Sequence, residues 1–207
     1  MKIRFNIFIL LSMMLFMVSC GGMNKLPFKG TGFGGPQNSE EARIAKTINH
    51  DPIVFVHGVY SSSDAWSYAR KFFLTNGYNV HEIFAINFKD DAVFFISPEA
   101  SELNRFIKNV LKYTGRKKVV IVAHSRGGMA ARVFLKMFKG YRYVSKCVLI
   151  ASPNHGTNNT VDQDIIKPGT SFLRSLNEPE EVMQGVDYLS IRASIDEFYE
   201  GNTANSP

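Results

Sequence analysis

The chain has 207 residues, of which 45% are hydrophobic and 20% charged, and its formal net charge is +6. This size and composition predict one globular domain plus extensions, large enough for a full core, and a second domain is not expected. Its densest basic cluster is Arg116–Lys118, at the start of a predicted strand. Because Lys and Arg form no long run, the charge pattern excludes a nucleic-acid-binding groove.

The N-terminus has the layout of a secretory signal. Lys2 and Arg4 precede an apolar run, Phe5–Val18, that is too short to span a bilayer comfortably. The segment Met17–Cys20, at the end of this run, resembles a bacterial lipobox in which Met takes the place of the usual Leu. This resemblance implies that Cys20 becomes the lipidated first residue of a mature lipoprotein at the outer membrane or cell surface. An ordinary signal peptidase site nearby is the alternative.

Three regions are expected along the chain. Residues 1–19 form the signal peptide, and residues 20–50 form a lipidated flexible tether because glycine and proline are frequent in it. The folded domain occupies residues 51–207. The letters of Gly30–Gly35 match a dinucleotide-binding pattern, but no strand precedes them, so no nucleotide site is predicted there.

From Pro52 onward, short apolar runs alternate with amphipathic segments. Strands separated by helices predict a parallel sheet with helices on both faces, which is an α/β fold. Ligands bind at the carboxyl ends of the strands in such sheets. The predicted strands are Ile53–Val56, Val80–Phe88, Val119–Ala123, Cys147–Ala151 and Tyr188–Arg192, and the predicted helices are Asp64–Leu74, Glu99–Tyr113 and Gly127–Phe138.

One strand-to-helix junction carries a serine in an Ala-x-Ser-x-Gly pattern, at Ala123–Gly127. A strained turn with a nucleophilic serine at its apex needs small residues two positions before and two after it. The turn also places the backbone N–H of Arg126 at a helix N-terminus, where negative charge is favoured. The pattern therefore indicates Ser125 as a nucleophile, although a plain strand-to-helix connection would look the same.

Together with three other motifs, this junction resembles the α/β-hydrolase fold, specifically small bacterial lipases and esterases whose elbow begins with Ala. The resemblance runs from about residue 51 to 198 and implies hydrolysis of carboxylic esters of hydrophobic acyl groups through an acyl-enzyme on Ser125. The motifs that carry it are Val56–Gly58, Ala123–Gly127, Ser152–Thr157 and Ser190–Asp196.

The resemblance also assigns roles to single residues. Val59 and Arg126 would supply the two backbone N–H groups of the oxyanion hole. Asp196 would be the acid of the triad, because it matches the family's Ile-x-x-Ser-x-Asp pattern, and Glu197 beside it is the rival. His57 lies in the oxyanion loop and is expected to be structural.

The family's catalytic base is a histidine after one more strand, but the sequence has no histidine beyond His155. The resemblance therefore implies that the C-terminal strand, histidine and helix are missing. The favoured interpretation is an incomplete or frameshifted product. The alternatives are a catalytically inactive lipoprotein that keeps the scaffold for binding, and His155 as a replacement base. His124, beside the nucleophile, is expected to be a packing residue.

Two apolar stretches that we predict to be loops at the same edge of the sheet would suit an acyl chain. They are Ala92–Ile96 and the group Phe172, Leu173 and Leu176; ordinary packing is the alternative for Phe94 and Ile96.

No metal-ligand spacing, phosphate-binding loop or credible redox motif is found in the sequence, so no metal or cofactor is expected. With Cys20 acylated, Cys147 is the only remaining thiol, and it is expected to be a small core residue outside any disulfide within the chain. The expected partners are a hydrophobic ester substrate and a membrane surface, with no nucleic acid and no obligate protein partner.

Overall fold

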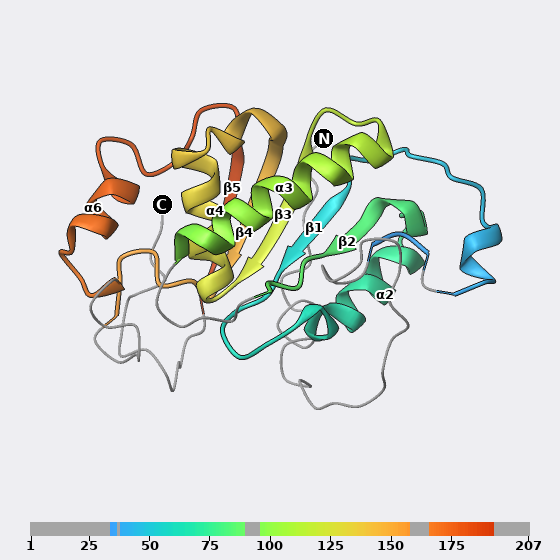
Figure 1. The fold of residues 1–207 in the computed structure, drawn as a ribbon, viewed down its shortest axis with the longest axis horizontal. Helices are drawn as coiled ribbons and strands as arrows, with labels where there is room; N and C mark the ends of the chain where they lie inside the picture. Colours follow the sequence, from blue (N-terminus) through green and yellow to red (C-terminus); the bar gives the residue numbers. More distant parts are fainter. Residues whose placement is uncertain (1–33, 37, 90–95, 158–165, 193–207) are drawn as a thin grey trace.

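The computed structural model describes residues 34–36, 38–89, 96–157 and 166–192. Its centre is a five-stranded sheet in the order β2-β1-β3-β4-β5, in which every neighbouring pair is parallel (Figure 1). This confirms the predicted α/β class. The strands are β1 (Ile53–Val56), β2 (Ile83–Ala85), β3 (Val119–His124), β4 (Val144–Ile150) and β5 (Asp187–Ile191).

Helices cover both faces of the sheet, as the sequence predicts. On one face lie α3 (Ile96–Thr114) and α4 (Arg126–Met137), and on the other lies α2 (Ser67–Thr75) (Figure 1). A further helix, α6, spans Ser171–Asn177. Short 3₁₀ turns complete the described elements: η1 (Glu41–Arg43), η2 (Ser63–Trp66), η3 (Val80–Glu82) and η4 (Gly140–Tyr143).

Side chains of each strand alternate between the two faces because successive residues of a strand point in opposite directions. In β1, Val54 packs with α3 and α4, whereas Ile53 and Phe55 pack on the side of α2. All three are buried. Both faces of the sheet are therefore apolar, which is why the strands are nearly continuous hydrophobic runs.

The second strand is shorter than predicted. Its expected first residues, Val80–Glu82, form a 3₁₀ turn, because Asn79 and Glu82 make a capping box. The Asn79 side chain accepts a hydrogen bond from the backbone of His81, and the Glu82 carboxylate accepts one from the backbone N–H of Asn79 at 2.7 Å. These local bonds compete with strand pairing, so the strand begins at Ile83.

The predicted apolar loop around Leu173 is wrong. Phe172, Leu173 and Leu176 belong to α6, and the two leucines are buried in the core beside α4. Thr170 caps this helix by accepting a hydrogen bond from Leu173 N–H. Ile96 is likewise a buried residue of α3. The rest of the other predicted loop, residues 92–95, lies outside the described residues.

The last part of the predicted tether contacts the domain. Glu41 pairs with Arg70 of α2 at 2.7 Å, and the backbone N–H groups of Asn49 and His50 donate to the Glu82 carboxylate. The predicted signal peptide and the predicted lipidation site, Cys20, lie outside the described residues. Within the part of the chain that the structure describes, no helix combines the length and the hydropathy needed to cross a bilayer.

Candidate active site

Backbone strain marks the carboxyl edge of three neighbouring strands. Tyr60, Ser125 and Ala151 have positive φ angles of 53°, 52° and 46°, and they follow β1, β3 and β4. Residues other than glycine rarely adopt this conformation, and such residues gather at functional sites. The strain therefore points to the edge at which the sequence places the nucleophile.

Ser125 stands at the apex of a sharp turn between β3 and α4. Its φ and ψ angles are 52° and −128°, a conformation that serine adopts only under constraint. Two backbone hydrogen bonds hold the turn: Ser125 N–H donates to Ile150 of β4 at 2.8 Å, and Gly128 N–H donates to Ser125 at 2.9 Å. This is the geometry of a nucleophile elbow.

The small residues around Ser125 are required by close packing. A Cβ atom added to Gly127 would lie 2.3 Å from the backbone oxygen of His57, a distance that no real Cβ tolerates. A Cβ atom on Gly58 would lie 3.0 Å from the Cβ of Ser125. The loop after β1 is therefore pressed against the elbow, and Ala123 below it is fully buried.

The two predicted oxyanion donors lie on these two packed segments. Val59 directly follows Gly58, and Arg126 is the first residue of α4. The first N–H groups of a helix have no partner within the helix and carry partial positive charge. The arrangement brings Val59, Ser125 and Arg126 to one edge of the sheet, where two backbone amides could stabilise an oxyanion.

The Arg126 side chain makes an ion pair that the sequence analysis missed. Its Nε atom lies 3.1 and 3.2 Å from the two carboxylate oxygens of Glu99 in the first turn of α3. Each side chain is only 6% exposed. The sequence indicated that Glu99 is buried, since Glu99 stands four residues before Leu103 and so lies on the apolar stripe of its helix, but it did not indicate the partner.

His57 has a structural role. Its Nε2 lies 3.4 Å from the N–H of Phe88, which can only donate, so Nε2 accepts. The proton is then on Nδ1, which donates to the carbonyl of Gly58 at 2.8 Å. With both nitrogens engaged, His57 supports the oxyanion loop, as expected.

Two other histidines lie at the opposite edge of the sheet. His81 contacts the Tyr113 hydroxyl through Nδ1 and the Ile44 carbonyl through Nε2, at 2.5 and 3.1 Å. His50 pairs with Glu82 through Nδ1 at 3.1 Å. Both precede their strands, so neither is near the nucleophile.

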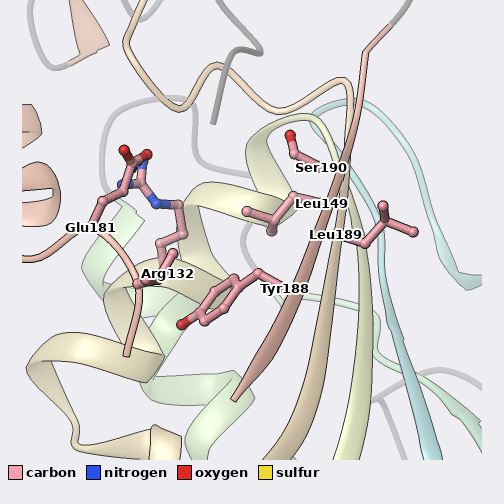
Figure 2. Close-up of a pocket in the computed structure, with 7 residues that line it drawn as sticks. Arg132, Leu149, Glu181, Tyr188, Leu189 and Ser190 are labelled. Carbon is pink, nitrogen blue, oxygen red and sulfur yellow. Dashed lines mark hydrogen bonds and ion pairs between the residues drawn. The ribbon is translucent and has the colours of Figure 1, made fainter. Parts of the chain in front are cut away.

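His155 follows β4 but pairs away from the elbow. Its Nε2 lies 3.1 Å from one oxygen of Glu181. The other oxygen of Glu181 lies 3.2 Å from Arg132, and Figure 2 shows these two side chains together. Arg132 is seven residues beyond Ser125, which is about 10 Å along a helix that rises about 1.5 Å per residue. These contacts give no support to His155 as the base.

Figure 2 shows the cavity beside this pair, which Arg132, Leu149 and Tyr188 line. Its volume of about 10 Å³ corresponds to a single water molecule, so it cannot hold an ester. Burial raises the pKa of Tyr188 to about 12 and lowers the pKa of Arg132, while Glu181 opposes the shift of Arg132. The residues that line this cavity therefore stabilise the fold, and the cavity is not a substrate site.

A second cavity, of about 230 Å³, lies on the α2 side of the sheet. We call it the α2-side groove. His57 and His124 stand at its carboxyl end, and its other lining is mainly apolar, including Phe55, Trp66, Val122, Val148, Leu189 and Ile191.

Asp196 and Glu197, the predicted acid and its rival, lie outside the described residues, so the roles assigned to them stay predictions. Among residues 34–36, 38–89, 96–157 and 166–192, no group of three or more His, Cys, Asp or Glu side chains could hold a metal ion.

Comparisons with known proteins agree with the family and the fold that the four sequence motifs resemble. The family model described as lipase (class 2) matches residues 50–205. Mature Bacillus licheniformis lipase BlEst2 is similar in structure, with 23% identity, a TM-score of 0.50 and coverage of 70% of this chain and 69% of that one.

Two further structures are more distant in sequence. Phospholipase PlaB from Legionella pneumophila has 16% identity and a TM-score of 0.59 over 74% of this chain and 41% of its own. Aspergillus fumigatus lipase B has 15% identity and a TM-score of 0.53 over 62% of this chain and 34% of its own. At these identities the likeness shows the α/β-hydrolase fold, and this chain spans only about a third of the Aspergillus protein.

Proposed function

Because this chain belongs to the class 2 lipase family, we propose that it is a serine hydrolase that cleaves carboxylic esters of hydrophobic acyl groups through an acyl-enzyme on Ser125. The observation that carries the proposal is the strained conformation of Ser125 at the junction of β3 and α4, where Gly58 packs against Ser125 and Gly127 packs against the backbone of His57. Strain of this kind persists only where the surrounding structure enforces it.

The proposed reaction has two steps. The Ser125 hydroxyl oxygen attacks the ester carbonyl while its proton passes to a base, and the N–H groups of Val59 and Arg126 stabilise the oxyanion. The alcohol leaves with that proton, and the acyl group stays on Ser125. Water then attacks the acyl-enzyme carbonyl and loses a proton to the base. The bond between the acyl carbon and Ser125 Oγ breaks, the base returns its proton to Oγ, and the carboxylic acid is released. Asp196 would orient a histidine base and stabilise its charged form.

A catalytically inactive α/β-hydrolase-like lipoprotein with a binding or scaffold role is the second candidate. One observation favours it: His155, the alternative candidate for the base, pairs with Glu181. Removal of one member of a triad leaves a residual rate far below that of the full enzyme. This candidate predicts the same fold without turnover.

The proposed substrate class rests on the family and on the names of similar proteins, which include two lipases and a phospholipase. The apolar loops that first suggested it support it less, because Ile96, Leu173 and Leu176 pack in the core. Hydrolysis of p-nitrophenyl esters of increasing acyl length would test the preference directly.

A fluorophosphonate probe tests the nucleophile. The wild-type chain should be labelled, and Ser125→Ala should abolish labelling. Ser175→Ala is the matched control, because Ser175 is an exposed serine of α6 outside the loop after β1 and the elbow, and it should not affect the reaction. Equal labelling of the Ser125→Ala protein would refute the proposed nucleophile, and a wild-type chain that is never labelled would favour the inactive candidate.

A lipid anchor at Cys20 is the second part of the proposal. Acyl chains add membrane affinity with each buried methylene, so the mature protein should partition with membranes, at the outer membrane or cell surface. A metabolically supplied fatty-acid analogue should label the wild-type chain and not Cys20→Ser. Unchanged incorporation in that variant would refute the anchor.

A further inference from the structure

The ion pair between Arg126 and Glu99 stands directly beside the nucleophile. The two side chains are almost fully buried, and Arg126 Nε contacts both carboxylate oxygens at 3.1 and 3.2 Å. Removing two charges from water is unfavourable, so a buried pair of this kind needs a compensating role.

The oxyanion donor at this position does not explain the arginine. That donor is a backbone N–H, which every residue except proline possesses. A cation is also unfavourable in the first turn of a helix, where the dipole is positive. The Arg126 side chain must therefore serve something other than the donor itself, and it contacts α3.

The elbow is fixed from three sides. Ser125 N–H is bound to β4, Gly127 is pressed against the loop after β1, and Arg126 is tied to α3 through Glu99. The first two contacts hold the atoms on either side of the peptide group between Ser125 and Arg126. The ion pair holds the side chain of Arg126, which lies between Ser125 and Gly127, and α3 and α4 lie side by side along the sheet (Figure 1).

We propose that Glu99 is a positioning residue, which acts through Arg126 to aim the Arg126 N–H at the oxyanion of the tetrahedral intermediate. This inference rests on the proposed function of Ser125. It also predicts that loss of the Glu99 charge slows the reaction, which is the opposite of the change that electrostatics alone would predict. Neutralising Glu99 would remove a negative charge near the oxyanion, which on electrostatic grounds should accelerate the reaction, whereas loss of aim should slow it.

The test compares four proteins by labelling with a fluorophosphonate probe, by kcat and KM for a short-chain p-nitrophenyl ester, and by thermal unfolding. They are wild type, Glu99→Gln, the double variant Glu99→Met with Arg126→Met, and Glu41→Gln. The last is a matched control, since Glu41 pairs with the buried Arg70 far from the elbow. An apolar pair in place of a buried ion pair often restores stability, so the double variant separates folding from aim.

We expect labelling and kcat to fall about 10-fold to 100-fold in Glu99→Gln, with KM little changed, because loss of a whole oxyanion donor costs about 100-fold to 1,000-fold. The double variant should unfold near the wild-type temperature yet stay slow, and Glu41→Gln should react at the wild-type rate. Recovery of both stability and rate in the double variant, or a faster Glu99→Gln protein, would overturn the inference alone. An unlabelled wild-type chain would refute the proposed function and this inference with it.

Discussion

The two faces of the sheet differ in how completely they are covered, although the same strands supply both. On the face of α3 and α4, Val54, Ile121 and Cys147 are fully buried. On the face of α2, Val148 is only partly buried and Leu189 is 43% exposed. Among the described elements, α2 and η2 pack over Phe55 of β1, and the α2-side groove extends beside them along β3, β4 and β5.

We call the face of α3 and α4 the closed face and the face of α2 the open face. The difference between them indicates that contacts on the closed face hold the candidate site in place. Arg126 begins a helix of the closed face and is tied there to Glu99, and Arg132, further along the same helix, binds Glu181. The open face contributes His124 and the groove. We therefore expect substitutions on the closed face to unfold the protein and to disturb the elbow, and those on the open face to change association more than stability.

The largest expected effect is that of Arg132→Ala. This guanidinium donates to the Asn154 carbonyl at 2.8 Å, to Asn177 at 2.6 Å and to Glu181 at 3.2 Å, and so it joins three segments on the closed face. Removing one partner of a buried ion pair costs about 3–5 kcal/mol. Urea unfolding should show a loss of this size.

Lys146→Ala is the control for that experiment. Lys146 pairs with Asp187 at 2.8 Å between β4 and β5, but both side chains are exposed. Its removal should leave the unfolding midpoint unchanged, because such surface pairs contribute little. Equal losses in the two variants would show that the faces do not differ in this respect.

The second prediction uses Cys147 as a reporter of the closed face. Burial raises the pKa of this thiol from 9.0 to about 12, although Arg132 partly opposes the shift. The thiolate fraction at pH 8 is then about 1,000-fold lower than for a thiol of pKa 9, so a disulfide reagent should react far more slowly with folded than with unfolded protein. Cys20→Ser should be the background, so that Cys147 is the only thiol.

The same shift fixes the sign of a pH effect. A thiol whose pKa is raised by folding holds its proton more tightly in the folded state, so its ionisation opposes folding above about pH 9. Stability should therefore fall as the pH rises from 9 towards 12, and Cys147→Ala should remove that part of the fall. Fast labelling of the native protein at pH 8 would contradict a closed face.

The third prediction makes the same deletion on each face. Val54→Ala on the closed face should cost about 2–3 kcal/mol of unfolding free energy, since it removes two buried methyl groups and leaves a cavity. Val148 lines the α2-side groove, so Val148→Ala should cost less than about 1 kcal/mol of unfolding free energy. Chemical denaturation of both variants measures the contrast, and similar costs would mean that both faces are equally packed.

The sequence predicted the local features of the fold and site well. Ile53–Val56, the stripe of α3 and the elbow at Ser125 each follow from a pattern within one segment, and the structure confirms the strand, the helix and the strained turn. The helix α6 was missed because a seven-residue segment gives too few apolar repeats to separate it from an apolar loop.

Contacts between distant segments were beyond reach. The pairs Arg126–Glu99 and Arg132–Glu181 join residues 27 and 49 positions apart, and a charged residue gives no sign of its partner. Burial on the two faces was equally hidden, because Val54 and Val148 occupy similar apolar runs. Only the position of the covering helices separates them.

The most direct test of the open face comes from Leu189→Lys, for which the expected effect on stability is small. Leu189 lies on β5, which pairs with β4 alone among the described strands, and its side chain lines the α2-side groove. An exposed apolar groove invites association between copies of a chain. A lysine there should weaken self-association, measured by sedimentation velocity over a range of concentrations, and change the unfolding free energy by less than about 0.5 kcal/mol.

Val182→Lys is the matched control, since Val182 is 41% exposed but does not line the groove, and it should leave association unchanged. The groove does not drive association if wild type is monomeric at every concentration, or if both lysine variants act alike. The folded chain would then be stable without a second copy that covers the open face.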